Sequence, residues 1–114
     1  MSTEPLGPSE AISVRDLADM QTAGKEHAVV DVRETRELAI CRLDGALHIP
    51  MAEISARADE LPRDRLLVVV CHHGARSQMV VDYLRDAGFD NAVNLDGGVD
   101  AWACDIDPSM PRYR

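Results

Sequence analysis

The sequence predicts an α/β fold in which a mostly parallel central sheet carries helices on both faces. Short apolar segments at residues 28–32, 46–49, 66–70 and 91–95 are typical of buried strands, and helix-compatible segments separate them. Strands that alternate with helices are joined by crossovers, which make neighbouring strands parallel. The length of 114 residues and the hydrophobic content of 46% suit one compact domain.

The first half of the chain contains two predicted strands. Ser13 is a suitable N-cap for a first helix, which is expected to end at Gly24. Residues 28–32 are short, apolar and β-branched, and they predict a buried strand. Residues 33–43 are charged and helix-compatible, and residues 46–49 predict another short strand that stops at a proline.

The second half continues the alternation of helices and strands. Residues 51–61 are helix-like, and residues 66–70 form the strongest strand pattern of the chain. Residues 78–87 place apolar side chains at helical spacing before a glycine. Residues 91–95 predict a last strand, and residues 99–104 predict a short helix.

Both ends of the chain differ in composition from the predicted domain. Residues 1–10 are polar and contain two prolines and a glycine, so we expect a flexible leader. The folded domain is expected to span residues 11–107. Pro108 and Pro111 then predict an irregular tail over residues 108–114.

Charge and cysteine usage exclude several classes of function. The chain has 20 acidic and 12 basic residues and a formal net charge of −8, so it should not bind nucleic acid or anionic membranes. It has no signal-peptide pattern and no apolar run near the roughly 20 residues that span a bilayer. Three widely spaced cysteines, Cys41, Cys71 and Cys104, suit reduced thiols. We therefore expect a cytoplasmic protein.

The main candidate for chemistry is a cysteine at the point where the strongest strand turns into a helix. Unpaired N–H groups at the start of a helix, and the charge of Arg76 in the same turn, both lower the pKa of a cysteine. Gly74 lets the loop curl without a Cβ, so that successive N–H groups can converge on one point. The candidate loop consists of Cys71, His72, His73, Gly74, Ala75, Arg76 and Ser77.

Two other segments should lie near this loop. Asp31 and Arg33 lie at the end of the first predicted strand, and residues 96–98 follow the last one. Ligands of parallel α/β sheets bind beyond the carboxyl ends of the strands, so we expect these segments to gather at one rim. Asp31 is expected to accept loop N–H groups, and Arg33 to pair with Glu37.

Several motifs occur together in an order that resembles the single-domain rhodaneses, sulfurtransferases of the rhodanese-like superfamily. The resemblance extends from about residue 12 to about residue 107. It implies a rhodanese-like three-layer fold for residues 11–107. Its motifs are Val30-Asp31-Val32-Arg33, Glu37, Gly45-Ala46, Ile49-Pro50, the loop 71–76, Asn94-Leu95-Asp96-Gly97-Gly98 and Ala101-Trp102.

The resemblance implies a persulfide mechanism. Cys71 would take a sulfane sulfur from a donor such as thiosulfate and pass it to a thiophilic acceptor, with no metal or organic cofactor. The acceptor would be cyanide, a small thiol, thioredoxin or a sulfur-relay protein. Arg76 would hold the anionic donor, because a guanidinium offers a planar fork of donors. His72 and His73 are interpreted as lining the entrance, where they gain charge as the pH falls, rather than as metal ligands.

Two alternative functions remain within the same fold. Cell-cycle phosphatases that resemble rhodaneses place five residues between the cysteine and the arginine, whereas Cys71 and Arg76 enclose four. A regulatory or partner-binding module with little catalysis is the second alternative, and an intact Cys71 and Arg76 argue against it. The sequence also departs from the family pattern at Cys41-Arg42-Leu43, where relatives usually read Gly-His-Ile. A redox role for Cys41 or Cys104 stays open, although we expect Cys41 to be a bystander outside the site.

Overall fold

The structure is a computed structural model that describes residues 11–114. Its central feature is one sheet of five strands in the order β1-β5-β4-β2-β3, with every neighbouring pair parallel. The predicted parallel sheet is therefore confirmed. The expected leader lies outside the described residues. The strands are β1 (Ala11–Ile12), β2 (His27–Asp31), β3 (Leu47–His48), β4 (Leu66–Val70) and β5 (Ala92–Leu95).

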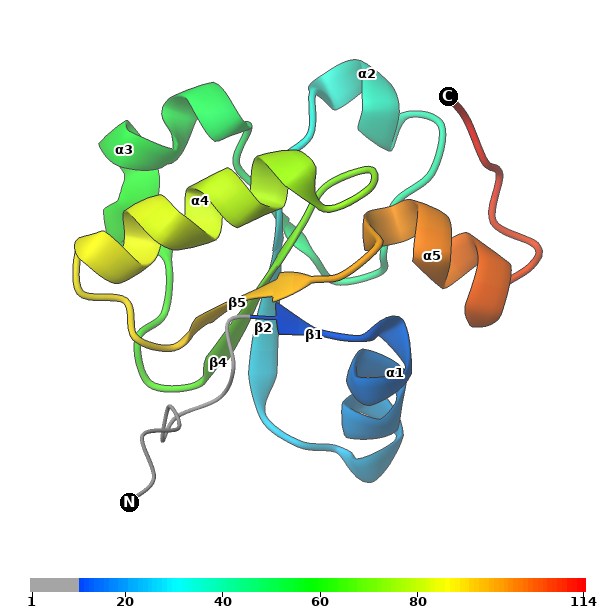
Figure 1. Cartoon of the computed structure of the whole chain (residues 1–114), viewed down its shortest axis with the longest axis horizontal. Coiled ribbons are helices and arrows are strands. Elements are labelled where there is room, and N and C mark those ends of the chain that lie inside the picture. The colour runs from blue at the N-terminus through cyan, green and yellow to red at the C-terminus, as the bar shows by residue number, and fades with distance from the viewer. Residues whose placement is uncertain (1–10) are drawn as a thin grey trace.

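Helices cover both faces of this sheet, as Figure 1 shows, with α3 and α4 on one side and α1 and α5 on the other. Among residues 11–114, no helix is long and apolar enough to cross a bilayer. The helices are α1 (Val14–Ala23), α2 (Thr35–Leu38), α3 (Ile54–Arg57), α4 (Ala75–Asp86) and α5 (Gly98–Asp105), and the 3₁₀ segments are η1 (Met51–Glu53) and η2 (Ala58–Glu60).

The sheet separates two hydrophobic cores. Successive side chains of a strand point to opposite faces, so Leu67 and Val69 enter one core while Val68 and Val70 enter the other. Both faces of β4 are thus buried, which explains its continuous apolar run. Cys71 belongs to the core beneath α3 and α4, whereas Cys41 belongs to the core beneath α1 and α5.

Most of the predicted elements are present, and the differences have local causes. The first helix begins after Ser13, whose side chain accepts the N–H of Asp16 in a capping box, and it ends at Gly24 with φ of 68°. The helix-compatible segment 33–43 contains only the four-residue α2, because Arg33 turns inward and is fully buried. Residues 51–61 are split into η1, α3 and η2.

Two further differences lie close to the site. Helix α4 begins at Ala75, three positions before the predicted start of residue 78, because Gly74 acts as its N-cap. The edge strand β1 was not predicted, since two residues carry no periodic pattern. Residues 108–114 contain no helix or strand, yet Met110 and Tyr113 pack against the core beneath α1 and α5.

Candidate active site

The candidate site is the loop between β4 and α4. Strand β4 ends at Val70 and delivers Cys71 to the carboxyl edge of the sheet, directly before the first turn of α4. Gly74 has φ of 114°, a conformation that other residues rarely adopt. A Cβ at this position would lie 3.4 Å from the backbone nitrogen of Gly97. The loop therefore needs glycine for its backbone angle, while the space around Gly74 would leave a Cβ at ordinary contact distance.

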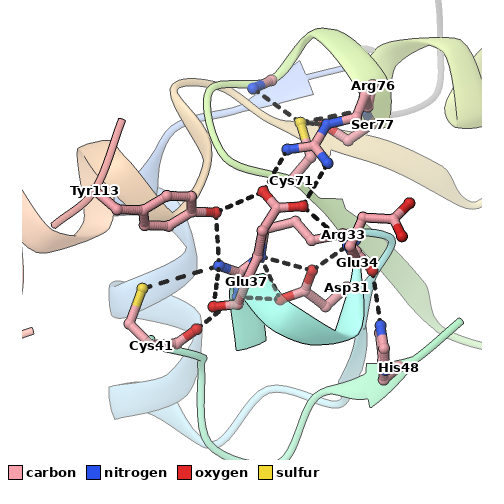
Figure 2. Close-up of polar contacts among 11 residues, drawn as sticks. Asp31, Arg33, Glu34, Glu37, Cys41, His48, Cys71, Arg76, Ser77 and Tyr113 are labelled. Carbon is pink, nitrogen blue, oxygen red and sulfur yellow. Dashed lines mark hydrogen bonds and ion pairs between the residues drawn. The ribbon is translucent and has the colours of Figure 1, made fainter. Parts of the chain in front are cut away.

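The sulfur of Cys71 is enclosed by hydrogen-bond donors (Figure 2). The N–H of Gly74 lies 3.1 Å from Sγ, the N–H of Ser77 lies 3.3 Å away, and Ser77 Oγ lies 3.2 Å away. Cys71 itself is 1% exposed. Several donors directed at one sulfur stabilise a negative charge on it more than they stabilise a neutral thiol.

The hydroxyl of Ser77 links Cys71 to Asn94 on β5. Ser77 Oγ also donates to Asn94 Oδ1, while Asn94 Nδ2 donates to the carbonyl of Gly74 at 3.1 Å and to Gln78 Oε1 at 3.3 Å. These two donations fix the orientation of the amide. Because the hydroxyl carries one proton, it can donate to Asn94 when the sulfur is protonated and to the sulfur when it is ionised.

Asn94 was not predicted as a site residue. It is only 4% exposed and lies within the apolar strand β5. A polar side chain inside a buried strand needs hydrogen-bond partners. The occurrence of an asparagine in this apolar segment was therefore the feature of the sequence that could have indicated a site residue. The partners themselves come from another element, so the local sequence does not identify them.

The start of α5 holds the other side of the loop. The N–H of Val99 donates to the carbonyl of Cys71 at 3.0 Å, and the N–H of Asp100 donates to the carbonyl of His72 at 3.1 Å. Gly98 has φ of 61°, and a Cβ there would overlap both carbonyl oxygens. Gly97 is the N-cap of α5. The absence of a side chain on Gly98 allows the close approach to both carbonyl groups.

Asp31 and Arg33 form a buried ion pair below the loop. Arg33 Nη2 lies 2.7 Å from Asp31 Oδ2, and the backbone N–H of Arg33 donates to Asp31 Oδ1 at 3.0 Å. Arg33 Nη2 also donates to the carbonyl of Cys41 at 2.8 Å. The expected pairing of the Arg33 and Glu37 side chains was wrong, because Arg33 turns toward Asp31 and Glu37 has another partner.

That partner is Arg76 from the loop. Both terminal nitrogens of Arg76 lie 2.8 Å from the carboxylate oxygens of Glu37, which also accepts the N–H of Glu34 at 3.0 Å (Figure 2). The hydrogen bond from Arg76 holds the pKa of Glu37 well below its usual range. The full positive charge that the sequence places in this turn is therefore offset by Glu37, and Arg76 is not an open fork for an anionic donor.

The two loop histidines differ in their surroundings. The side chain of His73 is 63% exposed, and its Nδ1 lies 3.9 Å from Asp100 Oδ2. His72 is 8% exposed, and its ring stacks on Tyr113 with centroids 3.8 Å apart and an interplanar angle of 6°. Burial lowers the pKa of His72, and neighbouring His73 lowers it further. His72 is therefore expected to gain its charge at a lower pH than an ordinary histidine.

Tyr113 lies in the segment that was predicted to be an irregular tail, and it was not predicted as a site residue. Its hydroxyl donates to Glu37 Oε1 at 2.8 Å and accepts a hydrogen bond from Arg33 Nη1 at 3.0 Å. Burial raises the pKa of Tyr113 to about 12. This hydroxyl therefore connects the Asp31–Arg33 pair with the Glu37–Arg76 pair.

The remaining cysteines lie outside this arrangement. Cys41 is buried in the opposite core, Cys104 is exposed, and all three cysteines are free. Within the part of the chain that the structure describes, no group of three or more His, Cys, Asp or Glu side chains could hold a metal ion.

The comparisons with known proteins converge on one family. A family described as "Rhodanese-like domain" matches residues 13–105. A protein named sulfurtransferase from Allochromatium vinosum is 40% identical over 95 residues, covering 83% of this chain and 84% of that protein. The probable adenylyltransferase/sulfurtransferase MoeZ of Mycobacterium tuberculosis is 38% identical over 104 residues, which cover 90% of this chain but only 26% of MoeZ. The chain thus spans about a quarter of MoeZ.

A solved structure shows the same architecture. The rhodanese-like domain protein from Staphylococcus aureus superimposes with a TM-score of 0.79 at 31% sequence identity, covering 92% of this chain and 99% of the other. The five-stranded parallel sheet and its helices therefore form the fold that the motifs implied.

Proposed function

Because the chain belongs to the rhodanese-like domain family, we propose that it is a sulfurtransferase whose nucleophile is Cys71. The observation that carries the proposal is the set of donors around Cys71 Sγ, from Gly74 N–H and from the N–H and hydroxyl of Ser77. A nucleophilic cysteine must act as the thiolate, and this environment stabilises a thiolate. The sulfurtransferase names of the relatives support the same class of reaction.

The proposed donor is thiosulfate or a similar anionic sulfane-sulfur compound. The Cys71 thiolate attacks the outer sulfur of thiosulfate, a new S–S bond forms, and sulfite leaves with the electron pair of the broken S–S bond. A cyanide ion or an acceptor thiolate then attacks the outer sulfur of the persulfide. The Cys71 thiolate is restored, and the acceptor carries the sulfur. The two steps balance without a metal or an organic cofactor.

Two unpaired arginines support an anionic donor. A cavity of about 270 Å³ beside the loop is lined by Arg36, Glu37 and Ile40, by Arg114 and by the stacked rings of His72 and Tyr113. The charge of Glu37 is already paired with Arg76. Among residues 11–114, neither Arg36 nor Arg114 has a hydrogen bond or an ion pair. On a protein with a net charge of −8, these two cations make the cavity beside His72 locally favourable for an anion. We assign to them the attraction of the donor, a role that the family resemblance implies for Arg76.

The acceptor is proposed to be a thiol, either a small molecule or one carried by thioredoxin or another sulfur-relay protein. A protein acceptor is suggested by the relatives that combine adenylyltransferase and sulfurtransferase in their names. Free cysteines suit a reducing compartment, and we propose a cytoplasmic location. A phosphatase is disfavoured by the four residues between Cys71 and Arg76. A silent binding module is disfavoured by the ordered donors around the sulfur.

Intact-protein mass spectrometry after incubation with thiosulfate tests this proposal. The wild type should gain the mass of one sulfur atom, and cyanide or dithiothreitol should remove it. Cys71→Ser should gain no sulfur and should show no thiosulfate:cyanide transfer, because a hydroxyl does not ionise here. Cys104→Ser is the matched control, since Cys104 is exposed, and it should behave as the wild type. Sulfur addition to folded Cys71→Ser would overturn the assignment of the nucleophile.

A further inference from the structure

The strongest unassigned feature is the contact between segment 110–114 and the candidate site. We propose that Tyr113 is a positioning residue of the active site, which holds the Glu37–Arg76 pair in place beside Cys71. The proposal rests on the sulfurtransferase function proposed above. It assigns a role to a segment that contains no helix or strand.

Tyr113 is held on two sides by the site itself. Its hydroxyl donates to Glu37 Oε1 at 2.8 Å and accepts from Arg33 Nη1 at 3.0 Å, while its ring stacks on His72. Figure 2 shows the hydroxyl between these two charged side chains, which come from the region following β2. The hydroxyl can satisfy both because a phenol is a donor and an acceptor at once.

The residue before Tyr113 fixes the segment to the same loop. Arg112 binds Asp100 through two nitrogens, at 2.9 and 3.0 Å, and the hydrogen bond from Arg112 lowers the pKa of Asp100. Asp100 in turn donates its N–H to the carbonyl of His72. Segment 110–114 is therefore attached to both ends of the site, at α5 through Arg112 and at Glu37 through Tyr113.

The effect of Tyr113 on the loop passes through Glu37. The Glu37 carboxylate accepts two hydrogen bonds from Arg76, one from the N–H of Glu34 and one from Tyr113. Without the phenol, Oε1 keeps Arg76 as its only donor, and the negative charge near Cys71 is less compensated. Arg76 directly precedes Ser77, whose N–H and hydroxyl lie 3.3 and 3.2 Å from Cys71 Sγ, so a change in the position of Arg76 reaches the donors of the sulfur. Tyr113 thus favours an ionised sulfur and a fixed guanidinium.

Tyr113→Phe isolates the hydroxyl, because it keeps the aromatic ring that stacks on His72. The matched control is Tyr83→Phe, since Tyr83 is the other tyrosine of the chain and is 44% exposed on α4. Loss of one hydrogen bond to a charged group should lower kcat/KM for thiosulfate about tenfold. Tyr83→Phe should leave kcat/KM unchanged. Both variants should keep the circular dichroism spectrum of the wild type.

A double-mutant cycle separates positioning from a general loss of structure. If Tyr113 acts through Glu37, Tyr113→Phe should change kcat/KM less than twofold in a Glu37→Gln background. An equal loss in both backgrounds, or no loss in the wild-type background, would overturn the proposal. If Tyr113→Phe fails to fold, Arg112→Ala loosens the segment while keeping the phenol, and it should lower kcat/KM in the same direction.

A readout without turnover keeps this proposal separate from the proposed function. The pH profile of Cys71 alkylation by iodoacetamide should move to higher pH in Tyr113→Phe and stay in place in Tyr83→Phe. That result would support the positioning role even if the wild type transferred no sulfur from thiosulfate. An unchanged alkylation profile beside normal sulfur transfer by the wild type would overturn the positioning role alone.

Discussion

Arg76 and Glu37 form a bidentate ion pair across 39 residues of sequence, with both nitrogen–oxygen distances at 2.8 Å. The pair joins the active-site loop to α2, and it is enclosed enough that the Glu37 side chain is only 11% exposed. Because both terminal nitrogens of this guanidinium are paired with Glu37, Arg76 supports the loop and is not free to bind a substrate anion. The contact therefore makes the stability of the fold depend on the ionisation of Glu37.

The first prediction concerns stability against acid. The pKa of folded Glu37 is lowered, chiefly by Arg76, so the unfolded chain binds a proton more readily than the folded one. The contribution should be complete above the unfolded value near ~4.3 and should be lost as the pH falls below it. Glu37→Gln should cost about 2 kcal/mol at pH 7, a discounted value because the Arg76 side chain is 32% exposed. Urea unfolding between pH 3 and pH 7 measures the difference.

The outcome at low pH is the decisive part of that measurement. Below the unfolded value near ~4.3, the unfolded chain takes up a proton on Glu37 while the folded protein keeps the carboxylate paired with Arg76, so the difference in stability between the wild type and Glu37→Gln should shrink steadily toward pH 3. A difference that stayed constant from pH 7 to pH 3 would show that Glu37 acts through packing rather than through its charge. Glu26→Gln is a suitable control, since Glu26 is exposed and lies 3.4 Å from Arg65 at the surface.

The second prediction concerns Ser77. Ser77→Ala removes the hydroxyl at 3.2 Å from Cys71 Sγ but keeps the N–H donor of the same residue. The alkylation profile of Cys71 should therefore move to higher pH, and kcat/KM for thiosulfate should fall about tenfold. Stopped-flow alkylation over a pH series measures the first effect. Asn94→Asp should act in the same direction, because a carboxylate beside Ser77 Oγ retains the hydroxyl proton more strongly.

If Ser77→Ala left the pH profile of Cys71 alkylation unchanged, the backbone N–H groups of Gly74 and Ser77 would stabilise the thiolate without help from the hydroxyl. Ser55→Ala is the matched control. Ser55 is an exposed serine on α3 with no side-chain hydrogen bond among residues 11–114.

The third prediction concerns the cations that flank the cavity. Arg36→Ala should raise KM for thiosulfate about two- to fivefold at low ionic strength. An exposed charge contributes little to the binding free energy of an anion, but it attracts the anion at long range when little salt is present. The effect should shrink at high salt, while kcat stays close to the wild-type value. Arg15→Ala on α1 removes another exposed arginine, one whose side chain has no ion pair or hydrogen bond among residues 11–114, and it should leave KM unchanged. Equal rises in KM for both variants would point to net charge rather than to this cavity.

The sequence predicts the scaffold of the site better than its contacts. Strand β4 and the first helix are recognisable because an unbroken apolar run and a Ser13 cap are local signals. The Glu37–Arg76 pair and the Tyr113–Glu37 hydrogen bond join positions 39 and 76 residues apart, and no periodicity encodes them. For Arg33 the local pattern was misleading: Glu37, four positions along the predicted helical segment, was expected to be its partner, whereas Arg33 is buried and pairs with Asp31.

The last prediction concerns Cys41, the thiol that departs from the family pattern. Cys41 and Cys71 lie in cores on opposite faces of the sheet, so their side chains do not face each other. A disulfide needs Cα atoms within about 7 Å and Cβ atoms directed at one another. Cys41→Ser should therefore keep most of the sulfurtransferase activity under reducing conditions. After peroxide treatment, peptide mapping of the wild type should find sulfinic acid at Cys71. A Cys41–Cys71 cross-linked peptide would contradict this prediction and would give Cys41 a protective role against over-oxidation.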